Sequence, residues 1–67
     1  MSKGQQQEHI ELEDVRIKAR TLRAVLIVYE DAEHWIPLSQ VDGDPIVDVS
    51  KTIRLTPWIM EQRGIEP

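Results

Sequence analysis

The fold is decided by two neighbouring stretches, Val15-Arg16-Ile17-Lys18-Ala19-Arg20 and Ala24-Val25-Leu26-Ile27-Val28-Tyr29. The first alternates apolar and basic residues, which is the period of a half-buried strand with its basic side chains on the outer face. The second is apolar on both faces, and its β-branched residues favour a strand over a helix. A strand that is apolar on both sides must be covered twice or must leave one side for a partner.

The C-terminal residues carry the signature of a short helix. Thr56 is a good N-cap, Pro57 stands at the favoured first position, and Gly64 suits the position just past the last turn. A helix of about two turns is not stable alone, so it must pack against the sheet. We expect Trp58 and Ile59 to face the sheet, with Trp58 fixing the helix to it.

Shorter elements are predicted around these two regions. The alternation slips at residues 13–14, which indicates a bulge or a late strand start. A tight turn is expected at residues 31–32 and a concentrated turn signal lies at 42–45. Further strands are predicted over 33–36, 46–49 and 51–55, and a single 3₁₀ turn over 38–41.

These elements predict a mainly β (β+α) protein, a small bent antiparallel barrel or half-barrel of four to five strands with one short C-terminal helix. The segment 35–41 is similar to the strand, Pro-Ser and 3₁₀-turn element of SH3-like barrels. Residues 1–8 are polar and without periodicity, so we predict a disordered N-terminal tail there and a single β-rich domain over 9–67.

The overall composition limits the kinds of protein that this chain can be. The chain has 67 residues, no cysteine and a formal net charge of −4. This is enough for one small domain, which cannot use disulfides or thiolate-ligated zinc. The N-terminus has no apolar stretch typical of a secretory signal, and no apolar run is long enough for a membrane helix. We therefore expect a cytoplasmic protein without a membrane partner.

A family resemblance is carried by His34-Trp35-Ile36-Pro37, Ser39-Gln40, Pro57-Trp58-Ile59 and Gly64-Ile65. With the apolar stretch 24–28, these residues resemble a group of small bacteriophage- and prophage-encoded proteins, over roughly residues 15–65. The resemblance implies a phage-type accessory protein and no catalytic activity. This chain departs from the group at Leu38, where a basic residue commonly follows the proline.

The sequence gives little support for a catalytic site or a metal site. Ser39 and His34 stand five residues apart on a strand and its adjoining turn, which does not normally assemble a nucleophile with its base. Carboxylates beside the turns could be arranged around a hard cation, but they more often cap backbone amides. We therefore expect no enzyme, no cofactor and no metal site.

A basic face is the first candidate binding surface. Arg16, Lys18, Arg20 and Arg23 supply four of the eight positive charges. Alternation places the first three on one strand face about 6.6 Å apart, a spacing that could follow a nucleic-acid backbone. The alternative is a solvated face balanced by acids such as Glu30 or Glu33 on neighbouring strands.

The favoured hypothesis is a non-enzymatic module that binds protein. It rests on the stretch that is apolar on both faces and assigns the contact surface to Val25, Ile27, Tyr29 and Trp35. The partner could be a second copy paired along an antiparallel strand edge, or both faces could be covered within a closed monomer. We expect Trp35 in the core, whereas an exposed Trp35 would mark a binding hot spot.

Overall fold

The computed structural model describes residues 8–66 of the chain. Its elements in chain order are β2 (Ile10–Leu12), β3 (Arg16–Arg20), β4 (Ala24–Tyr29), β5 (Ala32–Pro37), the 3₁₀ turn η1 (Leu38–Gln40), β6 (Val41–Asp42), β7 (Ile53–Leu55) and α1 (Pro57–Arg63). The disordered tail predicted over residues 1–8 falls, apart from Glu8, outside the described residues.

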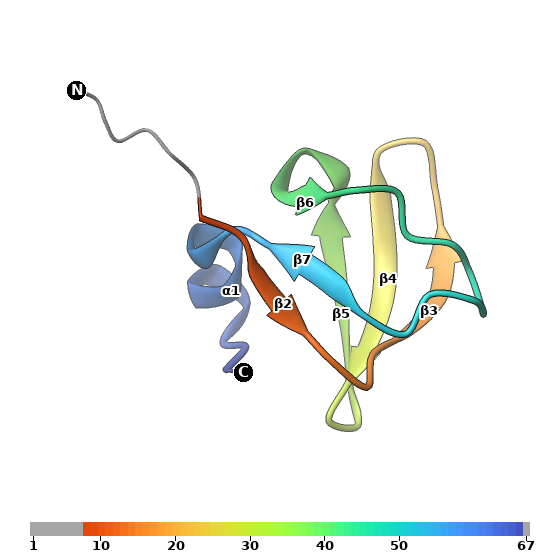
Figure 1. The fold of residues 1–67 in the computed structure, drawn as a ribbon, viewed down its shortest axis with the longest axis horizontal. Coiled ribbons are helices and arrows are strands. Elements are labelled where there is room, and N and C mark those ends of the chain that lie inside the picture. The colour runs from red at the N-terminus through yellow and green to blue at the C-terminus, as the bar shows by residue number, and fades with distance from the viewer. Residues whose placement is uncertain (1–7, 67) are drawn as a thin grey trace.

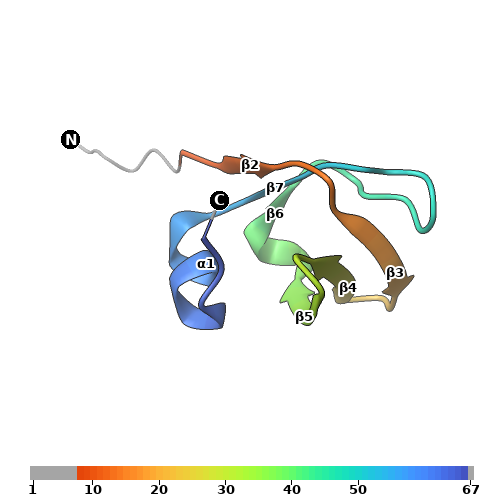
Figure 2. The ribbon, with the colours of Figure 1, turned by 90° about the horizontal axis from the view of Figure 1, so that it is seen from below.

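The strands form two antiparallel sheets of three strands each, in the orders β2-β7-β6 and β3-β4-β5 (Figure 1). Figure 2 shows them as two layers, with α1 beside β5 and beneath the first sheet. The mainly β architecture with one short C-terminal helix is confirmed. The strand pairings describe two separate sheets rather than one closed barrel.

The core lies between the two sheets and the helix and is aliphatic. Its fully buried side chains include Leu12 and Leu55 from the first sheet and Ile17, Ile27 and Ile36 from the second, each at most 1% exposed. The helix adds Ile59, Met60 and, just past its end, Ile65. Each such side chain contributes about 1.5–3 kcal/mol when it leaves water, so these residues stabilise the packing of all three layers.

The helix begins and ends where the sequence predicts. The Thr56 hydroxyl accepts a hydrogen bond from Ile59 N at 3.3 Å, and Pro57 occupies the first helical position. Gly64 adopts a left-handed conformation with φ of 68°. The amides of Gly64 and Ile65 then donate to the carbonyls of Glu61 and Met60, the two bonds of a Schellman motif.

The predicted orientation of the helix is confirmed for Ile59, which is buried together with Met60, but it is wrong for Trp58, which is 56% exposed. Successive helical residues are separated by about 100°, so a buried face centred between Ile59 and Met60 turns Trp58 toward solvent. The side chains that the helix buries are therefore Ile59 and Met60.

Two local predictions also need correction. Residues 47–49 form a turn instead of part of a strand over 46–49, because Ser50 Oγ accepts from Ile46 N at 2.8 Å and Asp48 has φ of 60°. The β4–β5 hairpin turns at Glu30 and Asp31, both with positive φ, one residue earlier than predicted.

Within residues 8–66, no helix has the length and apolar character needed to cross a membrane.

Candidate functional site

The outer face of sheet β3-β4-β5 carries an apolar row that crosses all three strands. Trp35 on β5 lies opposite Leu26 on β4, and Leu26 lies opposite Ala19 on β3. Trp35 is 46% exposed, whereas Leu26 is only 9% exposed. The expectation of a core Trp35 is therefore wrong. Its position instead fits the alternative, an exposed aromatic side chain at a contact surface.

An ion pair borders this row and spans the central strand. Lys18 Nζ lies 2.5 Å from Glu33 Oε2, and the two residues belong to the strands on either side of β4. Long side chains of this kind cover apolar surface with their methylene groups while their charged ends remain in water. The outer face thus has an apolar row with a charged border.

The four residues assigned to a protein-contact surface do not lie together. Val25 and Ile27 are 0% exposed and belong to the core, so they cannot form part of a surface. The reason is the period of two along β4, which turns these side chains toward the other sheet. Tyr29 follows the same phase and is half-buried at the end of the strand. Of the four, Trp35 alone lies on the outer face.

The basic residues are divided by a bulge in β3. Ile17 pairs with Ile27, but Ala19 pairs with Leu26, so the register shifts between them. Beyond this shift Arg20 pairs with Val25 and leaves the face that carries Arg16 and Lys18. The predicted row of three basic side chains on one face is therefore wrong, because an extra residue in a strand reverses the alternation that follows it.

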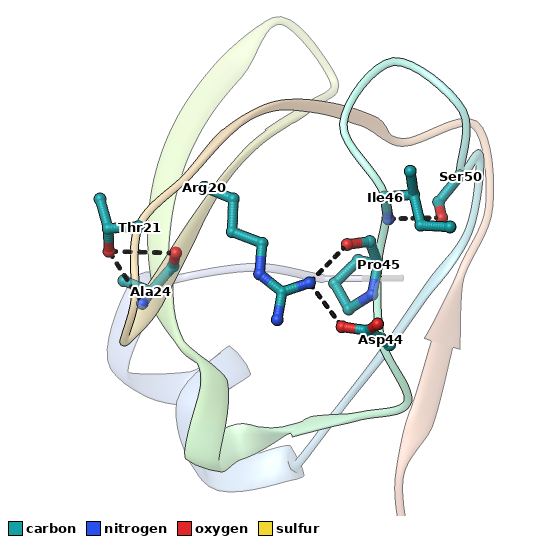
Figure 3. A network of polar contacts seen from close by, with 7 residues as sticks. All are labelled: Arg20, Thr21, Ala24, Asp44, Pro45, Ile46 and Ser50. Carbon is teal, nitrogen blue, oxygen red and sulfur yellow. Dashed lines mark hydrogen bonds and ion pairs between the residues drawn. The ribbon is translucent and has the colours of Figure 1, made fainter.

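Arg20 instead reaches the loop that follows β6 (Figure 3). Its Nη1 donates to Asp44 Oδ1 at 2.5 Å and to the carbonyl of Pro45 at 3.0 Å. Arg16 lies 3.6 Å from Asp48, and Lys18 is paired with Glu33. Three of the four basic residues therefore face intramolecular carboxylates, which offsets the charge they present to a phosphate backbone.

A groove of about 620 Å³ lies at the end of the molecule where β2 leads into β3 and β4 turns into β5. Its lining contains five carboxylates, Glu11, Glu13, Asp14, Glu30 and Asp31, together with Arg16 and Tyr29. Burial raises the pKa of Tyr29, and the charges of Glu30 and Asp14 raise it further. The groove is therefore a region of negative potential.

A second hollow, of about 580 Å³, lies on the side of the molecule that carries η1 and the start of α1. It is lined by His9, Ser39, Gln40, Thr56 and Trp58. Thr56 is 5% exposed and donates from Oγ1 to Gln40 Oε1 at 2.6 Å. Sequence reasoning missed this arrangement, because the two polar residues are 16 positions apart and no local pattern relates them.

Ser39 lines this hollow together with His9, while His34 is a half-buried residue of β5. Among residues 8–66, no group of three or more histidine, aspartate or glutamate side chains is arranged to hold a metal ion. The chain matches no protein-family model, and no curated protein or solved structure matches it significantly.

Proposed function

We propose that the domain is a non-enzymatic binding module that acts through protein–protein contact. The partner that we propose is a second copy of the chain. The observation that carries the proposal is the exposed indole of Trp35, which is 46% accessible in the apolar row that crosses the outer sheet face. Exposed tryptophans surrounded by apolar neighbours are the residue type that most often dominates binding energy at protein interfaces.

The row is self-complementary in size. It passes from Trp35 through Leu26 to Ala19, that is, from a large side chain through a medium one to a small one. A two-fold axis over Leu26 brings the Trp35 of each copy onto the Ala19 of the other. Such an isologous contact uses one patch twice and closes without leaving a free copy of the patch. The Lys18–Glu33 pair supplies the polar rim that interfaces of this kind have.

Contact through the face is favoured over the contact through a strand edge, because both edges of this sheet carry hydrogen bonds from within the chain. Beside β5, Arg63 Nε donates to the carbonyl of Trp35 at 3.1 Å. Beside β3, Val15 N donates to Lys51 O and Asp48 N to Ile17 O, each at 2.9 Å. Backbone groups that already bond within the chain are not free to pair with a strand from another chain.

The test is sedimentation equilibrium of the chain and of two matched tryptophan variants. Trp35→Ala is expected to raise the dissociation constant of the dimer at least about tenfold, since it removes a central aromatic anchor. Trp58→Ala, which removes the other exposed indole, is expected to leave the dissociation constant unchanged. Ala19→Arg should prevent dimerisation by filling the site of the partner's indole. A monomer at high micromolar concentration, or equal effects of the two tryptophan variants, would contradict self-association through this face.

The proposal also covers the type of fold, the origin of the protein and its location in the cell. We infer a half-barrel of SH3-like type, which the 3₁₀ turn Leu38–Gln40 between β5 and β6 supports. The residues from His34 to Gln40, through their resemblance, support a bacteriophage or prophage accessory protein that acts in the cytoplasm.

A further inference from the structure

The hollow beside Trp58 is built by three segments that are distant in the sequence. His9 precedes β2, Ser39 and Gln40 belong to η1, and Thr56 and Trp58 come from the cap and first turn of α1. Its volume of about 580 Å³ falls within the ~300–1,000 Å³ of small-molecule sites. None of these five side chains carries a permanent charge.

The hydrogen bonds of Thr56 fix the orientation of the Gln40 side chain. The Thr56 hydroxyl accepts from Ile59 N, and its single proton goes to Gln40 Oε1 at 2.6 Å. The carboxamide oxygen is thereby engaged, so the amide nitrogen with its two N–H donors is the free end of the group. Within residues 8–66 the hydrogen bonds of this side chain engage its oxygen alone. A buried threonine therefore presents a positioned donor from Gln40.

The remaining walls combine an apolar plane with polar groups. Trp58 is 56% exposed and lies outside the buried side of the helix, whose buried side chains are Ile59 and Met60. Ser39 is an exposed residue of η1, and the half-buried residue His9 also lines the hollow. The result is a flat aromatic surface with uncharged hydrogen-bonding groups beside it.

We propose that this hollow binds the ring of an uncharged saccharide. A pyranose has an apolar face of C–H groups, which packs on an indole, and an edge of hydroxyl oxygens, which accept from amide donors and exchange bonds with hydroxyl groups. It carries no charge, so it needs no ionic partner in the site. A nucleic acid would instead require cations along its phosphates, and this lining supplies none.

The proposal concerns a different surface from the one assigned to self-association, so either proposal can fail without affecting the other. The experiment titrates the full chain with maltotetraose, cellotetraose and chitotetraose and follows the two tryptophan indole N–H signals by NMR. At least one of the three sugars is expected to shift the Trp58 signal, with a dissociation constant of about 0.1–1 mM. The Trp35 signal should stay in place.

Three variants locate the site. Trp58→Ala is expected to weaken binding at least about tenfold, as the loss of a stacking surface does for planar rings. Gln40→Glu keeps an oxygen for Thr56 and replaces the donor nitrogen by an acceptor, so it should also weaken binding about tenfold while the fold is retained. Trp35→Ala is the matched control and should bind as tightly as the parent chain.

Three outcomes would overturn the proposal. Failure of all three sugars to shift the Trp58 signal at high millimolar concentration would exclude neutral saccharides. Binding that survives Trp58→Ala would place the ligand elsewhere. If a polyproline peptide shifts the Trp58 signal and the sugars do not, the hollow is a peptide site. Loss of dimerisation in Trp35→Ala without any change in sugar binding would leave this inference intact.

Discussion

Thr56 and Gln40 are joined by two hydrogen bonds, one between their backbones and one between their side chains. Thr56 N donates to Gln40 O at 3.1 Å, and Thr56 Oγ1 donates to Gln40 Oε1 at 2.6 Å. The same hydroxyl caps α1 through Ile59 N. One buried side chain therefore connects the helix to the 3₁₀ turn.

Replacing Thr56 with valine should lower the free energy of unfolding by about 1–2 kcal/mol, because the helix loses its cap and Gln40 its donor. Thr56→Ser keeps the hydroxyl and should recover most of that loss. Thr52→Val, at an exposed threonine, is the control and should change little. Urea denaturation measures all three. Equal losses for the valine and serine variants at position 56 would show that the hydroxyl does not act in this way.

Truncation of the two neighbouring apolar residues of α1 should lower stability to very different degrees. Ile59 is 1% exposed, so Ile59→Ala leaves a cavity and should cost about 2–4 kcal/mol of stability. Trp58 is 56% exposed, and Trp58→Ala should cost less than about 1 kcal/mol despite the larger side chain. Midpoints of thermal unfolding compare them. A larger loss for Trp58→Ala would mean that the indole packs on the sheet after all.

The chain has one tyrosine, so its ionisation can be followed by ultraviolet absorbance. Burial, Glu30 and Asp14 raise the pKa of Tyr29 above its ordinary value of 10.0. The folded state holds this proton more tightly than the unfolded chain does. Its contribution to stability is therefore complete below pH 10 and is lost as the pH rises through the folded-state pKa. Glu30→Gln should lower the pKa toward 10.0, and an unchanged titration would exclude the charge of Glu30 as a cause.

Nucleic-acid binding by the basic residues should be weak in the parent chain, since Arg16, Lys18 and Arg20 lie beside Asp48, Glu33 and Asp44. A gel shift with a short single-stranded oligonucleotide should show little binding at physiological salt. The combined variant Glu33→Gln, Asp44→Asn and Asp48→Asn frees these cations and should bind more tightly at low salt. Strong, steeply salt-dependent binding by the parent chain would instead favour a nucleic-acid partner.

The predicted helix ends and 3₁₀ turn, which depend on neighbouring residues, agreed with the structure. The cap at Thr56, the left-handed Gly64 and the 3₁₀ turn after Pro37 each reflect contacts within a few residues of the chain. The strand β4 was predicted with its bounds, because six consecutive apolar residues rich in β-branched side chains have few alternatives.

Predictions that depended on the pattern of apolar residues alone did not agree as well. The alternation of residues 15–20 was read as one uninterrupted strand, and the bulge between Ile17 and Ala19 turned Arg20 toward Asp44. The apolar content of residues 46–49 indicated a strand, but the hydroxyl of Ser50 closes them into a turn. In the first place an extra residue in the strand changed the alternation, and in the second a side-chain hydrogen bond replaced strand pairing.

The sequence by itself determined the β-rich class, the position of the helix and its two ends, because turn, cap and strand preferences act over a few residues and are present in the unfolded chain. Only the tertiary structure decided that Ile59 and Met60 enter the core while Trp58 and Trp35 remain in water, and that Gln40 meets Thr56. Those outcomes depend on how two sheets and a helix share a small interior, and aliphatic side chains from all three fill that space.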